Sequence, residues 1–187
     1  MTITTQPTTK SSTTKTTDDV DIEKTRWRID PARSSVEFRT PTFWGLVTVK
    51  GHFERYDGTL DLRRQPAIDL TIEADSLDTQ NKMRDKHLRA VKFFDAEHHP
   101  TVRFVSDAAK LEGERLTVRG QLHAGGYSKP IELEARVRRV GNELEVDTTT
   151  YVDQRDLGMT HSPLGMIRTP SELVVHGRLV RDQSGEG

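Results

Sequence analysis

Ile131-Glu132-Leu133-Glu134-Ala135-Arg136-Val137-Arg138 alternates apolar and charged residues without interruption. Because successive side chains of a β-strand point to opposite faces, this stretch predicts a strand with one dry face and one charged face. The same alternation returns in Ile68-Asp69-Leu70-Thr71-Ile72 and in Leu116-Thr117-Val118-Arg119. Short glycine-containing links such as Gly125-Gly126 and Gly141-Asn142 separate the runs, so neighbouring strands are expected to pair antiparallel.

About nine runs of this kind need a shared apolar interior, and closure into a barrel also removes exposed strand edges. We therefore predict an all-β fold, an antiparallel β-barrel of about eight or nine strands. Gly51, Gly120 and Gly177 lie inside strand patterns, where glycine usually marks a bulge, a bend or a close backbone approach. A barrel of about eight strands either fills its interior with side chains or leaves room for one ligand, and the pattern leaves both open.

One segment, near residues 78–91, lacks the alternation and predicts a short helix between two strands. Ser76 or Asp78 can cap its N-terminus, because a side-chain oxygen there accepts from free amides of the first turn. A lone helix in a chain of strands is expected to cover or gate what the strands enclose.

This helix is expected to turn a mixed face inward. At 100° per residue, one arc holds Met83, Arg84, His87, Leu88 and Val91. The side chains expected to point away into solvent are Lys82, Asp85, Lys86, Arg89 and Lys92. A buried cation is costly unless it is paired. Arg84 therefore either docks the helix by pairing with a barrel carboxylate such as Asp156, or meets the polar end of a ligand together with His87.

Two aromatic pairs are candidates for a barrel mouth. Phe43 and Trp44 lie in a predicted loop beside Pro41, and they either form an apolar entrance or plug the end of the core. Phe93 and Phe94 follow the helix, where a place in the core is the preferred interpretation.

Composition excludes several classes of protein. The chain has 187 residues, a net charge of -1 and no cysteine, so it shows no basic or acidic bias toward nucleic acid and no disulfide or thiolate chemistry. No apolar run approaches the roughly 20 residues that span a bilayer. The Thr/Ser-rich residues 1–25 and the tail 182–187 are expected to be disordered, which leaves one domain at 26–181. No apolar leader precedes the domain, so a cytoplasmic location is expected.

No motif for catalysis stands out. The seven histidines form no ligand spacing with a clear mechanism, no serine lies in a Gly-x-Ser-x-Gly elbow, and no glycine-rich loop opens a helix. We expect no enzyme, no cofactor and no metal, with a metal site assembled from distant strands as the minor alternative.

An ordered series of motifs across about residues 26–180 resembles the YceI-like, polyisoprenoid-binding family. The densest block runs from Ala74-Asp75-Ser76-Leu77-Asp78-Thr79 through Arg84-Asp85-x-His87-Leu88 to Phe93-Phe94-Asp95 and Pro100-x-x-x-Phe104. Further matching stretches are Trp27-x-Ile29-Asp30-Pro31, Gly51-x-Phe53-x-x-Tyr56-x-Gly58 and Arg155-Asp156-Leu157-Gly158. The resemblance implies a lipocalin-like barrel that encloses an apolar channel for an isoprenoid chain, and it implies no catalysis.

The functional expectation is non-catalytic transport or storage of an isoprenoid lipid, such as an isoprenoid quinone or a polyprenyl phosphate. The residues expected to contact it are Phe38, Phe43, Trp44, Phe53, Arg84, His87, Leu88, Phe94, Phe104 and Arg155. The expected partner is that lipid, with no nucleic acid and no stable membrane insertion, and a homodimer is left open. The alternative is a packed-barrel stress-response or protein-interaction module without lipid, and a metal enzyme ranks third.

Overall fold

The computed structural model describes residues 22–42, 46–64, 67–159 and 170–183. These residues form eleven strands and one α-helix of two turns, α2 (Lys82–Arg89). The strands are β1 (Trp27–Ile29), β2 (Ser35–Thr42), β3 (Val47–Phe53), β4 (Tyr56–Leu60), β5 (Ile68–Glu73), β6 (Leu77–Asp78), β7 (Thr101–Glu112), β8 (Arg115–Ala124), β9 (Tyr127–Val140), β10 (Glu143–Val152) and β11 (Ser171–Arg181). Three short 3-10 helices join them: η1 (Pro31–Arg33), η3 (Ala74–Ser76) and η4 (Gln154–Leu157).

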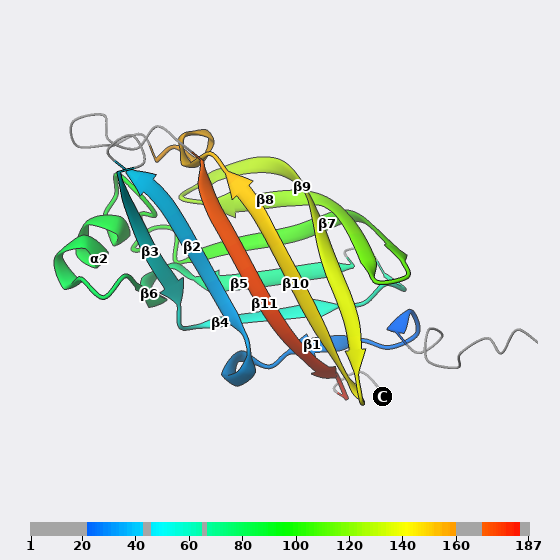
Figure 1. Cartoon of the computed structure of the whole chain (residues 1–187). Helices are drawn as coiled ribbons and strands as arrows, with labels where there is room; N and C mark the ends of the chain where they lie inside the picture. The colour runs from blue at the N-terminus through cyan, green and yellow to red at the C-terminus, as the bar shows by residue number, and fades with distance from the viewer. Residues whose placement is uncertain (1–21, 43–45, 65–66, 160–169, 184–187) are drawn as a thin grey trace, which may run out of the picture.

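Eight of the strands close into a ring in the order β1-β4-β5-β7-β8-β9-β10-β11 (Figure 1). The three-residue strand β1 closes it, because β1 pairs with β4 on one side and with β11 on the other. Every pairing is antiparallel. The predicted all-β barrel with one short helix is therefore confirmed.

The ring has a branch at β11. The C-terminal part of this strand pairs with β1, whereas Glu172 to His176 pair with β2, and β3 and then β6 continue the sheet from β2. The barrel is thus closed by β1 and β4 toward one end and extended by β2, β3 and β6 toward the other, where α2 lies (Figure 1).

The helix begins later than the sequence indicates. Ser76 belongs to η3 and Asp78 to β6, and the N-cap is Asn81, whose side chain accepts from the Arg84 amide. Asp78 instead accepts from the Gln80 amide at 2.6 Å and holds a tight turn in which Gln80 has φ of 61°. The oxygen that was expected to cap the helix therefore caps the turn before it.

The alternation of the strands places the core inside the barrel. In β8, buried and more exposed positions alternate along the whole strand. The largest fully buried side chains are Trp27, Leu77, Leu116, Leu144 and Val118. The close approach expected at a mid-strand glycine is found at Gly120, where an added Cβ would lie 2.3 Å from the Val105 carbonyl oxygen, beside a register shift in β7. Within the described residues, no helix is both long and apolar enough to cross a membrane.

Candidate functional site

The barrel encloses a cavity of about 250 Å³. A single water needs only roughly 10–15 Å³ of such volume, so this part of the interior is not filled by side chains. The wall comes from β2, β3, β5, β7 to β11, η4 and α2, whereas no described residue of β1 or β4 contributes to it. The cavity therefore lies away from the end that β1 and β4 close.

Along the inward face of β10, the interior changes from packed core to cavity. Leu144 is completely buried and lies outside the cavity wall, whereas Val146, Thr148 and Thr150 line the cavity. Leu144 pairs with Leu179 of β11, next to the strand segment that closes the ring. One face of β10 thus passes from a fully buried aliphatic residue, Leu144, to residues that line the cavity.

The end of the cavity near η4 carries neutral polar groups. The hydroxyls of Thr40 and Ser171 are 2.7 Å apart, and Ser171 Oγ lies 3.2 Å from Gln154 Oε1 as its donor. Thr148 and Thr150 lie on the neighbouring strand. The described part of the wall contains no Asp, Glu, Lys, Arg or His. Thr40, Ser171 and Gln154 bond one another, and almost all of the surface that faces the cavity is apolar. The site is therefore suited to a long apolar molecule.

Aromatic rings form the wall on the side of α2. Phe38 and Phe53 have ring centroids 5.9 Å apart, and the Phe53 and Phe94 rings are nearly perpendicular with centroids 6.0 Å apart. Phe104 and Leu88 complete this wall, so five predicted ligand contacts come together here. Phe93 also lines the cavity, and both Phe93 and Phe94 pack against the buried core as preferred. Phe43 and Trp44 lie outside the described residues.

Arg84 docks the helix and does not reach the cavity. Its guanidinium donates to the hydroxyl and the carbonyl oxygen of Thr79, at 2.8 and 2.7 Å, and it lines a groove on the outside of the barrel. The prediction that Arg84 pairs with Asp156 is wrong, because the Asp156 carboxylate accepts from Lys129 instead. Of the two interpretations of Arg84, the geometry supports the docking role, with Thr79 as the partner.

The inward face assigned to the helix is wrong in detail. His87 is exposed, as are Met83 and Val91, whereas Asp85 is buried and Arg89 is partly buried. The reason is that polar bonds orient the helix: Asp85 accepts from the Thr79 amide at 3.0 Å, and Arg89 donates to the Leu77 carbonyl oxygen. Only Met83 and Leu88 are apolar within Lys82–Arg89, so an apolar arc could not define the orientation.

Arg155 also lies outside the cavity wall. Its guanidinium donates to Asp153 at 2.9 Å, and this hydrogen bond lowers the pKa of the Asp153 carboxyl to about 2. Its neighbours Gln154 and Leu157 line the cavity instead. Sequence reasoning missed Thr148, Thr150 and Gln154 as parts of the cavity wall. The change from aliphatic residues to threonines along one face of β10 was a usable signal.

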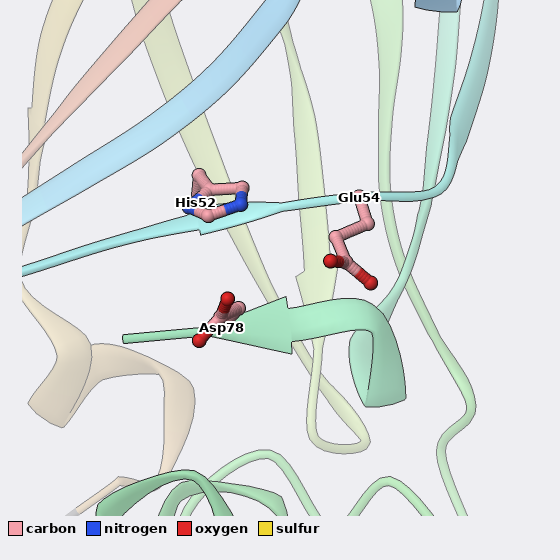
Figure 2. Close-up of side chains that lie close together, drawn as sticks. All are labelled: His52, Glu54 and Asp78. Atoms are coloured by element: carbon pink, nitrogen blue, oxygen red, sulfur yellow. The ribbon is translucent and has the colours of Figure 1, made fainter. Parts of the chain in front are cut away.

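A second cluster lies outside the barrel. His52, Glu54 and Asp78 come from β3, the residue after it and β6, and their ligand atoms all lie within 4.8 Å of one another (Figure 2). An imidazole and two carboxylates are side chains that can hold a metal ion.

Comparisons with known proteins agree with this architecture. The family model described as a YceI-like domain matches residues 27–179. Protein YceI of Salmonella arizonae and Protein YceI of Salmonella enteritidis PT4 are each 36% identical over 103 residues, a match that covers 53% of this chain and 54% of each relative. The chain thus spans about half the length of the curated relatives that it matches.

Three solved structures share the fold. BcnA of Burkholderia cenocepacia has a TM-score of 0.71 at 20% identity, over 80% of this chain and 98% of BcnA. A polyisoprenoid binding domain from Saccharophagus degradans, implicated in plant cell wall breakdown, also has a TM-score of 0.71. Its sequence is 14% identical over 85% of this chain and 100% of that domain. The Campylobacter jejuni YCEI protein has a TM-score of 0.64 at 24% identity, over 74% of this chain and 88% of that protein.

Proposed function

This chain belongs to the YceI-like family, and from that premise we propose that it binds an isoprenoid lipid inside its barrel as a non-catalytic carrier or store. The observation that carries the proposal is the cavity of about 250 Å³, whose described wall is aliphatic and aromatic and contains no charged side chain. Burial of apolar chain stabilises such a complex by about 0.8 kcal/mol per CH₂ group, so a few isoprene units supply a substantial driving force.

The lining favours a neutral head group over a phosphate. A buried ionised group without a partner is strongly unfavourable, and the described wall offers no cation to pair with one. A quinone head group carries no charge and so needs no such partner. Of the two head groups considered from the sequence, the isoprenoid quinone is therefore the one that we propose.

The cavity argues against the alternative of a packed barrel that acts only through its outer surface. A lumen filled by side chains would leave few voids larger than a water molecule. The described interior instead holds a volume large enough for part of an apolar chain.

The test is native mass spectrometry of the purified full chain, before and after incubation with an isoprenoid quinone or with a polyprenyl phosphate of equal chain length. The quinone should add as a one-to-one complex and the phosphate should bind more weakly. Equal or tighter binding of the phosphate would contradict the neutral head group, and no binding of either lipid would contradict the carrier role.

Two neighbouring residues of β10 give a matched pair of variants. Thr150 lines the cavity, whereas Thr149 is exposed on the outer face. Thr150→Trp should abolish quinone binding because the indole occupies the lumen, and Thr149→Trp should leave binding unchanged. Retained binding in a folded Thr150→Trp protein would show that the lipid lies elsewhere.

A further inference from the structure

A polar groove of about 720 Å³ lies on the outside of the barrel, over β3 and β6. It differs from the interior cavity in chemistry, because charged side chains line it, among them Glu37, Lys50 and Arg84. His52, Glu54 and Asp78 gather within this groove, and the lipid proposal does not use any of them.

Strand pairing holds the three side chains together. His52 of β3 is directly opposite Asp78 of β6, and Phe53 is opposite Leu77 in the only other pair between these strands. Glu54 follows β3, where its amide donates to the Ser76 carbonyl oxygen at 3.1 Å. Figure 2 shows the Glu54 carboxylate turned toward the Asp78 side of the cluster.

The distances between the three ligand atoms are slightly longer than those in a metal site. The three ligand atoms lie within 4.8 Å of one another. Around Zn²⁺, with ligand bonds of about 2.0–2.2 Å, neighbouring ligand atoms are roughly 3.0–3.5 Å apart. Glu54 is exposed and Asp78 is partly exposed, so rotation of their side chains can close the difference without a shift of the strands.

Lys50 and Arg84 line the same groove, but in the described part of the chain neither forms an ion pair with the carboxylates of the cluster. Most described carboxylates pair with an arginine or lysine, for example Asp69 with Arg103 and Glu143 with Arg33. Among the described residues, neither Glu54 nor Asp78 forms an ion pair, and Asp78 accepts only from the Gln80 amide. Two carboxylates this close repel each other, and a bound cation removes that repulsion.

We propose that His52, Glu54 and Asp78 form a Zn²⁺ site that fastens β6 to β3. The imidazole nitrogen selects a transition metal over Mg²⁺ or Ca²⁺, which take oxygen ligands. Three protein ligands leave a fourth position for water. The Gln80 amide orients the Asp78 carboxylate in the way that outer hydrogen bonds orient metal ligands.

The site would steady the segment that carries α2. Only two residue pairs join β6 to β3, and α2 begins at Lys82, four residues after Asp78. Leu88 of α2 lines the interior cavity. A Zn²⁺ ion bound outside the barrel would therefore hold in place a helix that forms part of the cavity wall, although it lies apart from any lipid.

Isothermal titration of ZnCl₂ into the metal-stripped full chain tests the site. One Zn²⁺ should bind per chain, and Asp78→Asn, Glu54→Gln and His52→Ala should each weaken binding by roughly tenfold or more. The matched control is His176→Ala, because His176 is exposed and contacts a single carboxylate, Asp147, at 2.8 Å. Thermal unfolding of each variant shows that it folds, and exposed Glu54 gives the variant least able to disturb folding.

The outcomes separate a built site from general attraction. Zn²⁺ binding that is absent, or that is equal in all the variants, would overturn the proposal. Mg²⁺ that binds as tightly as Zn²⁺ would overturn it as well, because it would show attraction to charge alone. Hydrogen exchange gives an independent reading: Zn²⁺ should slow exchange of the amides of residues 77–89, and unchanged exchange with Zn²⁺ bound would contradict the link between β6 and β3.

Discussion

Leu144 and Thr150 occupy the same inward face of β10, yet they belong to different kinds of interior. Leu144 is completely buried at the end that β1 and β4 close, whereas Thr150 lines an unfilled cavity at the end where β2, β3 and β6 extend the sheet. At the second end β2, β3 and β6 take the place of β1 and β4 beside β11, and side chains do not fill the interior there. We call the end closed by β1 and β4 the narrow end, and the end with the cavity the wide end.

This difference shows that the alternation of a strand specifies which side chains point inward. It does not specify whether they enter a packed core or line a cavity. Trp27 of β1 is completely buried and seals the narrow end. At the wide end an unfilled, almost entirely apolar cavity remains for a ligand to occupy. If this contrast is correct, residues at the narrow end contribute most to folding stability, and residues at the wide end contribute most to lipid binding. Variants at each end can then separate folding stability from lipid binding.

The largest expected effect is on stability at the narrow end. Leu144→Ala should lower the free energy of unfolding by about 2–5 kcal/mol, because it leaves a cavity in a packed region. Leu173→Ala, at a residue that already lines the cavity, should cost less than Leu144→Ala. Urea unfolding of both proteins measures the difference, and equal losses would show that the two ends are packed alike.

Two glycines give the next comparison. Gly120→Ala should cost about 1–3 kcal/mol, because the new Cβ would lie 2.3 Å from the Val105 carbonyl oxygen and 2.8 Å from the Ser106 Cα. Gly51→Ala should cost less, since its nearest clash, at 2.5 Å, is with the Phe38 ring, which can turn into the cavity. Quinone binding should instead weaken in Gly51→Ala. Unchanged binding in that variant would argue against a ligand beside Phe38.

A smaller effect is expected at the helix. Asp85→Ala removes the acceptor for the Thr79 amide, and it should lower stability by about 1 kcal/mol and speed hydrogen exchange over residues 79–89. The matched control is His87→Ala, which should change neither quantity because His87 is exposed. If His87→Ala and Asp85→Ala behave alike, α2 does not turn Asp85 inward and His87 outward.

The smallest effect concerns Asp153 at the wide end. Arg155 lowers the pKa of this carboxyl to about 2, so the ion pair stabilises the fold above the ordinary aspartate pKa of about 3.9 and loses that contribution as the pH falls toward 2. Asp153→Asn should lower the melting temperature slightly at pH 7, since the pair is partly exposed. The gap between variant and wild type should close near pH 2, and a gap that persists there would show that charge is not the cause.

Sequence alone was sufficient for the barrel, because the period-two alternation of strands such as β9 is a direct consequence of backbone geometry. It also located aromatic residues of the cavity wall, such as Phe38 and Phe104, since they fall on the dry face of their strands. The orientation of α2 could not be derived, because it depends on bonds from Asp85 and Arg89 to a segment whose path was unknown.

Two other features depend on three-dimensional pairing. The cavity exists because β2 and β3 join β11 at one end while β1 joins it at the other, and no local pattern encodes that branch. The cluster of His52 with Asp78 depends in the same way on the two residue pairs between β3 and β6. These residues lie 26 positions apart and carry no recognisable ligand spacing.

The closure by β1 also has a consequence for biosynthesis. Trp27 pairs with Arg181 and Ile29 with Leu179, so the seam joins the first strand to the last. The ring cannot close until the ribosome has released the chain through Arg181, and until then β1 and β4 can form only part of a sheet. Contacts this distant in sequence slow folding and leave strand edges exposed to other chains in the meantime. The edges of β1 and β10 that pair with β11 therefore stay unpaired until the final strand emerges.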